Sequence, residues 1–282
     1  MIAILGGLGA AAAWATTTLC AARASRLIDP GSLLAWVMTV GILVAGPAVA
    51  VVGIPPGLDA RVAGWLAVAG VGNVLGLLLA YSALRIGKVG LVAPITSTEG
   101  AVAAVIAVVA GERLAPGAGV SLGVIAVGVA LAASTPAGTE HARRSDVRAA
   151  LLAAAAAVSF GFAIYATGRV GDAIGIAWAV LPPRAVGVVV IALPLAVSGR
   201  LRLTRRAVPL VVAGGLCEVL GFASYVVGAR HGLAVSAVLA SQFAAVAALF
   251  GFLVFGERLG RVQLAGVVAI VAGVSVLSVL HG

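Results

Sequence analysis

Charged residues are scarce in this chain. They make up 10% of its 282 residues, and aromatic residues make up only 5%. A soluble domain carries roughly 25% charged residues, because its surface must stay hydrated. Hydrophobic residues instead reach 62%, and the mean hydropathy is +1.21. The lack of charge excludes a soluble globular protein and indicates a surface that faces lipid, so we expect an integral protein of the cell membrane with the lipid bilayer as its solvent.

Residues for metal, redox and nucleotide chemistry are also few. The two cysteines, Cys20 and Cys217, lie in apolar segments, and the three histidines are scattered. We therefore expect no disulfide, no metal site and no cofactor. The run Gly6-Gly7-Leu8-Gly9 lies inside an apolar segment and lacks the strand that precedes a phosphate-binding loop. The sequence holds no nucleophile–base pattern either, and we expect that the chain is not an enzyme.

Acidic residues are outnumbered by basic ones, which gives a formal net charge of +9 and a pI of about 11.2. Such a pI can indicate nucleic-acid binding. The arginines here occupy short gaps between apolar runs and form no basic stripe, so we expect no nucleic-acid partner. Basic residues gather in the odd-numbered connections, and the positive-inside rule would place those connections in the cytoplasm and both termini outside.

Apolar stretches long enough to cross a bilayer fill most of the chain. An α-helix of about 20 residues spans a hydrocarbon core of roughly 30 Å. Ten stretches of this kind are at residues 2–22, 32–53, 62–84, 90–110, 116–134, 148–169, 175–197, 207–229, 234–255 and 260–280. The predicted fold is an all-α integral membrane protein with ten transmembrane helices.

The two halves of the sequence are related. When the chain is shifted by 145 positions, the matching segments are Val74-Leu75-Gly76 with Val219-Leu220-Gly221, and Gly111-Glu112-Arg113-Leu114 with Gly256-Glu257-Arg258-Leu259. We predict a first five-helix repeat over 1–134, a polar linker over 135–147 and a second repeat over 148–282. Five is an odd number, so the second repeat enters the membrane from the opposite side, as in many alternating-access carriers.

These features resemble a known family. The Gly-Glu-Arg-Leu motif closes the fourth and ninth spans, Asp29-Pro30 opens the second, and Tyr81-Ser82-Ala83-Leu84-Arg85 ends the third. The chain thereby resembles the EamA-type, ten-helix branch of the drug/metabolite transporter superfamily. The resemblance implies transport of small metabolites, amines or amino acids, often outward and often driven by protons. It also implies cytoplasmic termini, whereas the distribution of basic residues predicts that both termini lie outside. Family members commonly carry an Arg early in the second span, but residues 34–38 of this chain contain none.

Three ionisable residues lie deep in the predicted spans, namely Glu99, Arg184 and Glu218. Glu99 lies roughly 14 Å into the fourth span at 1.5 Å per residue. A charge at such a depth costs about 2.5–3.5 kcal/mol or more. Arg stays protonated, so if both carboxylates are ionised, the three residues carry one net negative charge. A proton or a cationic solute would have to neutralise it. The alternative is a structural ion pair plus one protonated acid. The sequence leaves open which Glu pairs with Arg184.

Other polar and aromatic residues are weaker candidates. Asn73 and Gln242 lie mid-span and could line a solute cavity, or could form hydrogen bonds between helices. Trp14 and Tyr165 could supply aromatic walls for a cationic solute, or could serve as packing and interface anchors. Glu112 and Glu257 of the repeated motif lie at helix ends, and we interpret them as interfacial ion pairs or hinge contacts.

We therefore predict a secondary active transporter, in the outward direction, of a small metabolite, amine or amino-acid-like solute. It would work by alternating access and could exchange the solute for protons. Glu99, Arg184 and Glu218 should lie near one central water-accessible pocket between the halves. Two other classes stay open, a membrane-embedded enzyme and a membrane scaffold that transports nothing. The protein could be a monomer or a homodimer.

Overall fold

The computed structural model describes residues 1–111, 117–133, 140–170, 174–231, 236, 239–240 and 242–281, and every element in this part of the chain is a helix. The helices of the first half are α1 (Ile2–Ala24), α2 (Pro30–Val52), α3 (Ala60–Ile86), α4 (Val89–Thr96), α5 (Glu99–Val109) and α6 (Ala118–Ala133). Those of the second half are α7 (Glu140–Val170), α8 (Ile176–Gly187), the π-helical η2 (Val188–Ala192), α9 (Leu193–Val197), α10 (Val208–Ala229), α12 (Phe243–Phe255) and α13 (Arg261–His281).

The described helices fit a protein that crosses the membrane several times. Seven segments are long and apolar enough to span a bilayer, with α4 and α5 counted as one and the α8–α9 stretch as another. Three shorter apolar helices occupy Gly119–Ala132, Phe243–Phe255 and Arg261–Leu277. The prediction of a multi-pass, all-α membrane protein is therefore confirmed for the part of the chain that the structure describes.

Local sequence explains where several helices begin. Asp29 precedes α2, its Oδ1 accepts a hydrogen bond from the Ser32 N–H at 2.9 Å, and Pro30 occupies the first helical position. Asp59 accepts the Val62 N–H in the same way at 2.7 Å before α3. An acidic N-cap satisfies one of the free donors at a helix start. α7 begins at Glu140, inside the segment 135–147 that the sequence suggests as a linker. Residues 134–139 of that segment lie outside the described part.

The predicted fourth span, 90–110, is two helices rather than one. α4 ends at Thr96, α5 begins at Glu99, and Pro94 lies in the last turns of α4. The Ser97 and Thr98 hydroxyls donate to the Pro94 and Ile95 carbonyls, both at 2.8 Å. A proline removes a helix hydrogen bond, and the hydroxyls here bond to carbonyl groups next to the interruption. The break places Glu99 at the start of a new helix.

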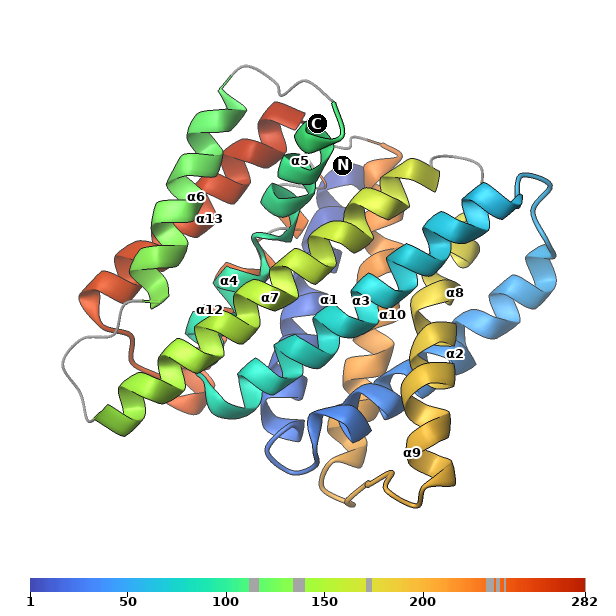
Figure 1. The fold of residues 1–282 in the computed structure, drawn as a ribbon, viewed down its shortest axis with the longest axis horizontal. Coiled ribbons are helices and arrows are strands. Elements are labelled where there is room, and N and C mark those ends of the chain that lie inside the picture. Colours follow the sequence, from blue (N-terminus) through green and yellow to red (C-terminus); the bar gives the residue numbers. More distant parts are fainter. Residues whose placement is uncertain are drawn as a thin grey trace.

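Helices from opposite halves pack together throughout the molecule (Figure 1). α1 packs along α10, α3 packs along α7, and α6 packs along α13 at one edge. α2 contacts α8 and α10, while α4 contacts α12. Small residues allow this close approach, since a Cβ added to Gly6 of α1 would lie 2.5 Å from the Gly228 Cα of α10. Such close backbone packing holds helices together where lipid removes the hydrophobic driving force.

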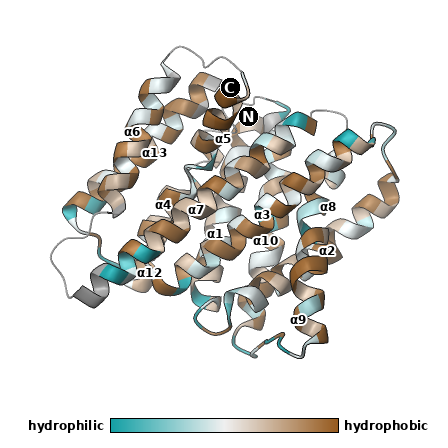
Figure 2. Cartoon of the chain, viewed as in Figure 1, coloured by the Kyte–Doolittle hydropathy of each residue, from teal (hydrophilic) through white to brown (hydrophobic). Residues whose placement is uncertain are grey.

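The distribution of apolar side chains suits a lipid environment. Leu43, Val51, Val109 and Val197 are each at least 70% exposed, whereas many of the buried residues are alanines. Figure 2 shows hydrophobic colour along the helices and hydrophilic colour mainly at the ends and connections. Both termini lie at one end of the molecule, opposite the connection between α9 and α10 (Figure 1). Many large apolar side chains thus point outward, as expected where lipid replaces water, while others, such as Leu33 and Met38, pack in the interior.

Candidate solute site

A buried ion pair joins α8 and α10. The Arg184 Nη2 lies 3.7 Å from the Glu218 Oε1, and the two side chains are 1% and 8% exposed. The Arg184 Nη1 also donates to the Val180 carbonyl at 3.2 Å. Gly41 of α2 leaves room for this side chain, because a Cβ there would lie 2.9 Å from the Arg184 Cγ. Among the two deep carboxylates, the partner of Arg184 is therefore Glu218.

Aromatic rings surround this pair on one side. The Arg184 Cζ lies 5.1 Å from the centre of the Phe222 ring, one helical turn after Glu218. Phe222 makes an edge contact with Trp14 of α1 at 5.5 Å, and Trp14 also contacts Tyr225 and Phe243, both at 6.1 Å. A ring face attracts a cation within about 6 Å of its centre. We call Trp14, Phe222, Tyr225 and Phe243 the aromatic cluster, and it extends the ionic site toward α1 and α12.

Glu99 is the deep carboxylate without an ionic partner. It is half-buried at the first position of α5, and it is close enough to Glu218 for the two charges to interact. Its side chain has no hydrogen bond or ion pair within the described residues. The N-terminal end of a helix favours a negative charge. Because the break after α4 places Glu99 at such an end, its side chain can be ionised as well as protonated.

Tyr81 belongs to this group, and the sequence analysis assigned it no role in the site. It is 2% exposed on α3 and interacts electrostatically with both Glu218 and Arg184. Its hydroxyl is buried without a hydrogen-bond partner among the described residues, as is the Asn73 Oδ1. Asn73, Leu77 and Tyr81 follow the i, i+4, i+8 spacing of one helix face. From the sequence, this spacing could have predicted that Tyr81 lies on the same helix face as Asn73.

Gln242 and Tyr165 have partners elsewhere. The Gln242 Nε2 donates to the Ser275 Oγ of α13 at 2.7 Å, which matches the hydrogen bond between helices that was the alternative to a solute role. Tyr165 accepts a hydrogen bond from the Arg169 Nε at 2.9 Å and contacts the Trp65 ring at 6.1 Å. Trp65 is 16 residues from Tyr81 along α3, roughly 24 Å, so Tyr165 lies apart from the ion pair. Ser241 is outside the described residues.

An apolar groove of about 410 Å³ lies between α3 and α7, and its lining is Ala67, Val68, Val71, Gly72, Leu75, Ser159 and Phe162. Several of these side chains are exposed large hydrophobics, so the groove belongs to the outer surface. The pocket expected around Glu99, Arg184 and Glu218 stays a prediction. The described residues contain no group of three His, Cys, Asp or Glu side chains that could hold a metal ion.

Comparisons with known proteins agree with this architecture. A crystal structure of a protein with 22% identity has the same fold, with a TM-score of 0.63 over 99% of this chain and 97% of the other. In all, 15 solved chains match. The comparison with curated proteins found no match. Residues 1–134 match the model of the EamA-like transporter family, which agrees with the resemblance of the sequence to the drug/metabolite transporter superfamily.

Proposed function

We propose that this protein is a secondary carrier that moves a small cationic or zwitterionic solute across the cell membrane by alternating access, in exchange for protons. The observation that carries the proposal is the buried Arg184–Glu218 pair together with Glu99, a second deep carboxylate that has no ion pair among the described residues. Because Arg184 neutralises Glu218, the remaining negative charge belongs to Glu99. A desolvated carboxylate with no cation beside it favours its protonated form. A proton and a cationic solute would then compete for Glu99.

The aromatic cluster supports the same assignment of charge. Trp14 lies half-buried beside Phe222, whose ring already holds the Arg184 guanidinium, and the half-buried Phe243 contacts Trp14. Aromatic faces favour organic cations when these lose their water. We assign Glu99 as the acidic ligand for the solute or the proton, and Glu218 as the fixed counter-ion of Arg184. The unpaired Tyr81 hydroxyl and Asn73 Oδ1 are further polar contacts for a solute or water.

The packing between halves supports an inverted repeat of five spans each. α1 packs along α10 as α7 packs along α3, and α2 contacts α10 as α8 contacts α3. The pairs α2 with α8 and α6 with α13 join equivalent elements, and α5 contacts α7 as α12 contacts α1. This pattern is unchanged when the halves are exchanged, which is the property of a two-fold arrangement. Rocking of one such half against the other gives alternating access around a fixed site.

Reconstituted protein tests the proposal directly. Purified protein in liposomes, loaded with a pH-sensitive dye, is exposed to a panel of primary amines, amino acids and organic anions. We expect at least one cationic or zwitterionic solute to drive proton movement in the opposite direction, with export favoured by the family resemblance. Glu99→Gln should abolish this coupling. Absence of flux for every solute class would leave a scaffold role, and flux of anions alone would contradict the role of Glu99.

A further inference from the structure

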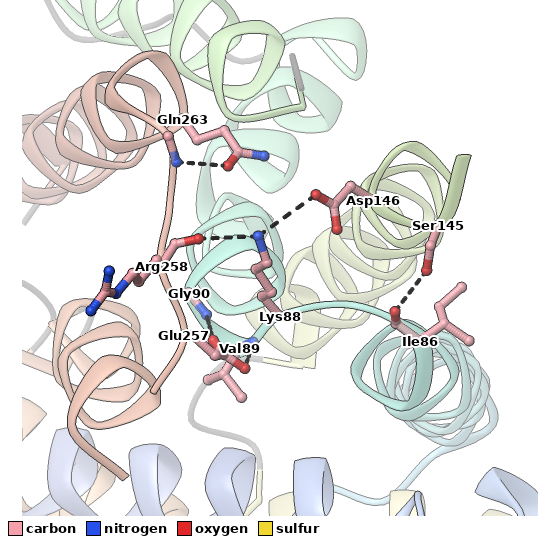
Figure 3. Close-up of polar contacts among 10 residues, drawn as sticks. Ile86, Lys88, Val89, Gly90, Ser145, Asp146, Glu257, Arg258 and Gln263 are labelled. Carbon is pink, nitrogen blue, oxygen red and sulfur yellow. Dashed lines mark hydrogen bonds and ion pairs between the residues drawn. The ribbon is translucent and has the colours of Figure 1, made fainter. Parts of the chain in front are cut away.

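The second Gly-Glu-Arg-Leu motif binds the start of α4. The Glu257 carboxylate accepts hydrogen bonds from the Val89 N–H at 2.9 Å and from the Gly90 N–H at 3.0 Å (Figure 3). These are the first two residues of α4, whose N–H groups have no partner within the helix. Of the two interpretations of Glu257, an interfacial ion pair or a hinge contact, these bonds favour the second. Glu257 caps a helix that belongs to the other half of the chain.

The backbone around Glu257 is shaped for this contact. Gly256 ends α12 with a φ of 64°, in the left-handed region that favours glycine. The turn brings the Glu257 N–H to the Gly251 carbonyl at 3.3 Å. Gly251 leaves space for the carboxylate, because a Cβ there would lie 2.9 Å from the Glu257 Oε2. The motif glycine and Gly251 thus aim the carboxylate at α4.

A second set of contacts holds the connection between α3 and α4. The Lys88 Nζ donates to the Arg258 carbonyl at 3.1 Å and lies 3.9 Å from the Asp146 Oδ2. The Ser145 Oγ donates to the Ile86 carbonyl at 2.8 Å (Figure 3). Residues 86–90 are therefore bound on one side by the α12–α13 connection and on the other by α7. All of these contacts lie at the same end of the molecule.

We propose that Glu257 is a positioning residue that holds this end of the transport pathway closed, and that opening requires its release from Val89 and Gly90. The inference rests on the proposed alternating access, in which contacts between halves at one end must break as those at the other form. α4 is about 12 Å long at 1.5 Å per residue. Its far end runs through the break at Ser97 to Glu99. Movement of α4 at the contact therefore reaches the acidic site.

The contact has the properties of a reversible closure. Glu257 is half-buried and the Lys88 side chain is 37% exposed, so water can replace their partners when the halves separate. The bond is also charge-assisted, because a carboxylate meets the positive end of a helix. A purely structural cap would affect only the stability of the fold. A gate would change how often this end opens.

Distance measurement between spin labels separates these two roles. Labels at Arg85, near the end of α3, and Arg261, the first residue of α13, occupy exposed positions in the two halves. The background carries Cys20→Ser and Cys217→Ser. We expect one principal distance in this background, and in Glu257→Gln we expect a second, longer distance whose population rises about tenfold. Arg258→Gln is the matched control, because its side chain is exposed and its carbonyl still accepts Lys88.

Unchanged distances in a folded Glu257→Gln protein would overturn the proposal, even if its melting temperature fell. If that variant does not fold, Glu257→Asp replaces it, since the shorter side chain can reach only one of the two N–H groups, and a wild-type distance distribution overturns the proposal in the same way. Liposome flux with the unlabelled wild type is scored separately. A failed flux assay rejects the carrier function, whereas an unshifted distance rejects the role of Glu257 alone.

Discussion

At the scale of residues, Arg184 determines how the charges of the interior are shared. Its planar guanidinium faces the Glu218 carboxylate and lies over the Phe222 ring at the same time, which a lysine ammonium cannot do in the same geometry. Arg184 Nε and Nη2 are buried and form no hydrogen bonds with the residues that the structure describes. The ion pair is therefore held mainly by charge and ring contacts, and it leaves donors that a solute or water can meet.

Glu99→Gln is expected to abolish pH-dependent transport while the folded protein stays in the membrane. Glutamine keeps the shape of the side chain but cannot release a proton, and in the part of the chain that the structure describes Glu99 has no ionic partner to lose. The measurement is solute flux at several pH values in liposomes, with the yield of monodisperse protein as the control for folding. Wild-type pH dependence in this variant would show that the carboxylate carries no proton.

Glu218→Gln should instead reduce the amount of folded protein, because it leaves the Arg184 charge unpaired in the interior. Breaking a buried pair costs about 3–5 kcal/mol. The double variant Arg184→Gln/Glu218→Gln should recover much of the yield, since neither charge is then buried alone. Melting temperatures of the two single variants and the double variant in detergent form a double-mutant cycle. Additive losses would contradict a direct coupling between the two side chains.

At the scale of elements, helix ends and breaks place the polar groups. The break between α4 and α5 moves Glu99 from mid-helix to a helix start, and the turn at Gly256 aims Glu257 at α4. The π-helical stretch η2 follows Pro182 and Pro183 in the seventh span. Prolines disturb the regular hydrogen-bond ladder. Irregular helix geometry thus occurs in spans that carry candidate site residues, Glu99 and Arg184.

Asp29→Ala should destabilise the start of α2 by about 1 kcal/mol at neutral pH, because an N-cap is lost. Burial raises the pKa of Asp29, but hydrogen bonds from Ser32 and the charge of Arg202 outweigh it and leave this pKa below its usual value. The stabilisation is therefore full above the unfolded pKa of about 4 and is lost as the pH falls through the folded pKa. The melting temperature of Asp29→Ala should therefore lie further below that of the wild type at pH 7 than at pH 3.

Gly6→Val should separate α1 from α10, because a Cβ at this position would meet the Gly228 backbone at 2.5 Å. Overpacking of this kind costs typically about 1–3 kcal/mol. Gly64→Val of α3 is the matched control, since a Cβ there meets nothing within 4 Å. Thermal stability in detergent should fall in the first variant and stay near wild type in the second. Equal losses would mean that β-branching in a helix, rather than contact between helices, causes the effect.

At the scale of the whole molecule, each half depends on the other for its packing. Many alanines lie in the interior, but large side chains such as Leu33, Leu91 and Ile270 are buried there too, in one core that both halves share. The longest helix pairs, α1 with α10 and α3 with α7, join the two halves. Motion between the halves must therefore slide or rock paired helices rather than separate two independent domains.

Cysteine labelling at Gly57 and Arg202 tests the inverted topology. These exposed residues follow the second and seventh predicted spans and are equivalent under the 145-residue shift. An inverted repeat places them on opposite sides of the membrane, so an impermeant thiol reagent should label only one of them in intact cells, and the other after permeabilisation. A parallel repeat, with an axis along the membrane normal, would place both on the same side.

Composition and local pattern were sufficient for the class of fold and the positions of most spans, while the inverted relation between the halves stays a prediction. These properties can be predicted because the hydropathy of a continuous segment of about 20 residues, and the turn residues at its ends, determine whether that segment spans the membrane. The family resemblance follows from motifs that are likewise continuous in sequence. The deep positions of Glu99, Arg184 and Glu218 could also be found, because a charged residue stands out in an apolar span.

The partners of those residues were decided only by the tertiary structure. Arg184 pairs with Glu218 across two helices, Tyr81 joins them from α3, and Glu257 binds the backbone of α4, 167 residues away in sequence. Each pairing depends on how helices are rotated and staggered against one another, and backbone N–H groups carry no signal in a sequence. Hydropathy determines that a helix lies in the membrane, while packing determines which of its faces meets another charge.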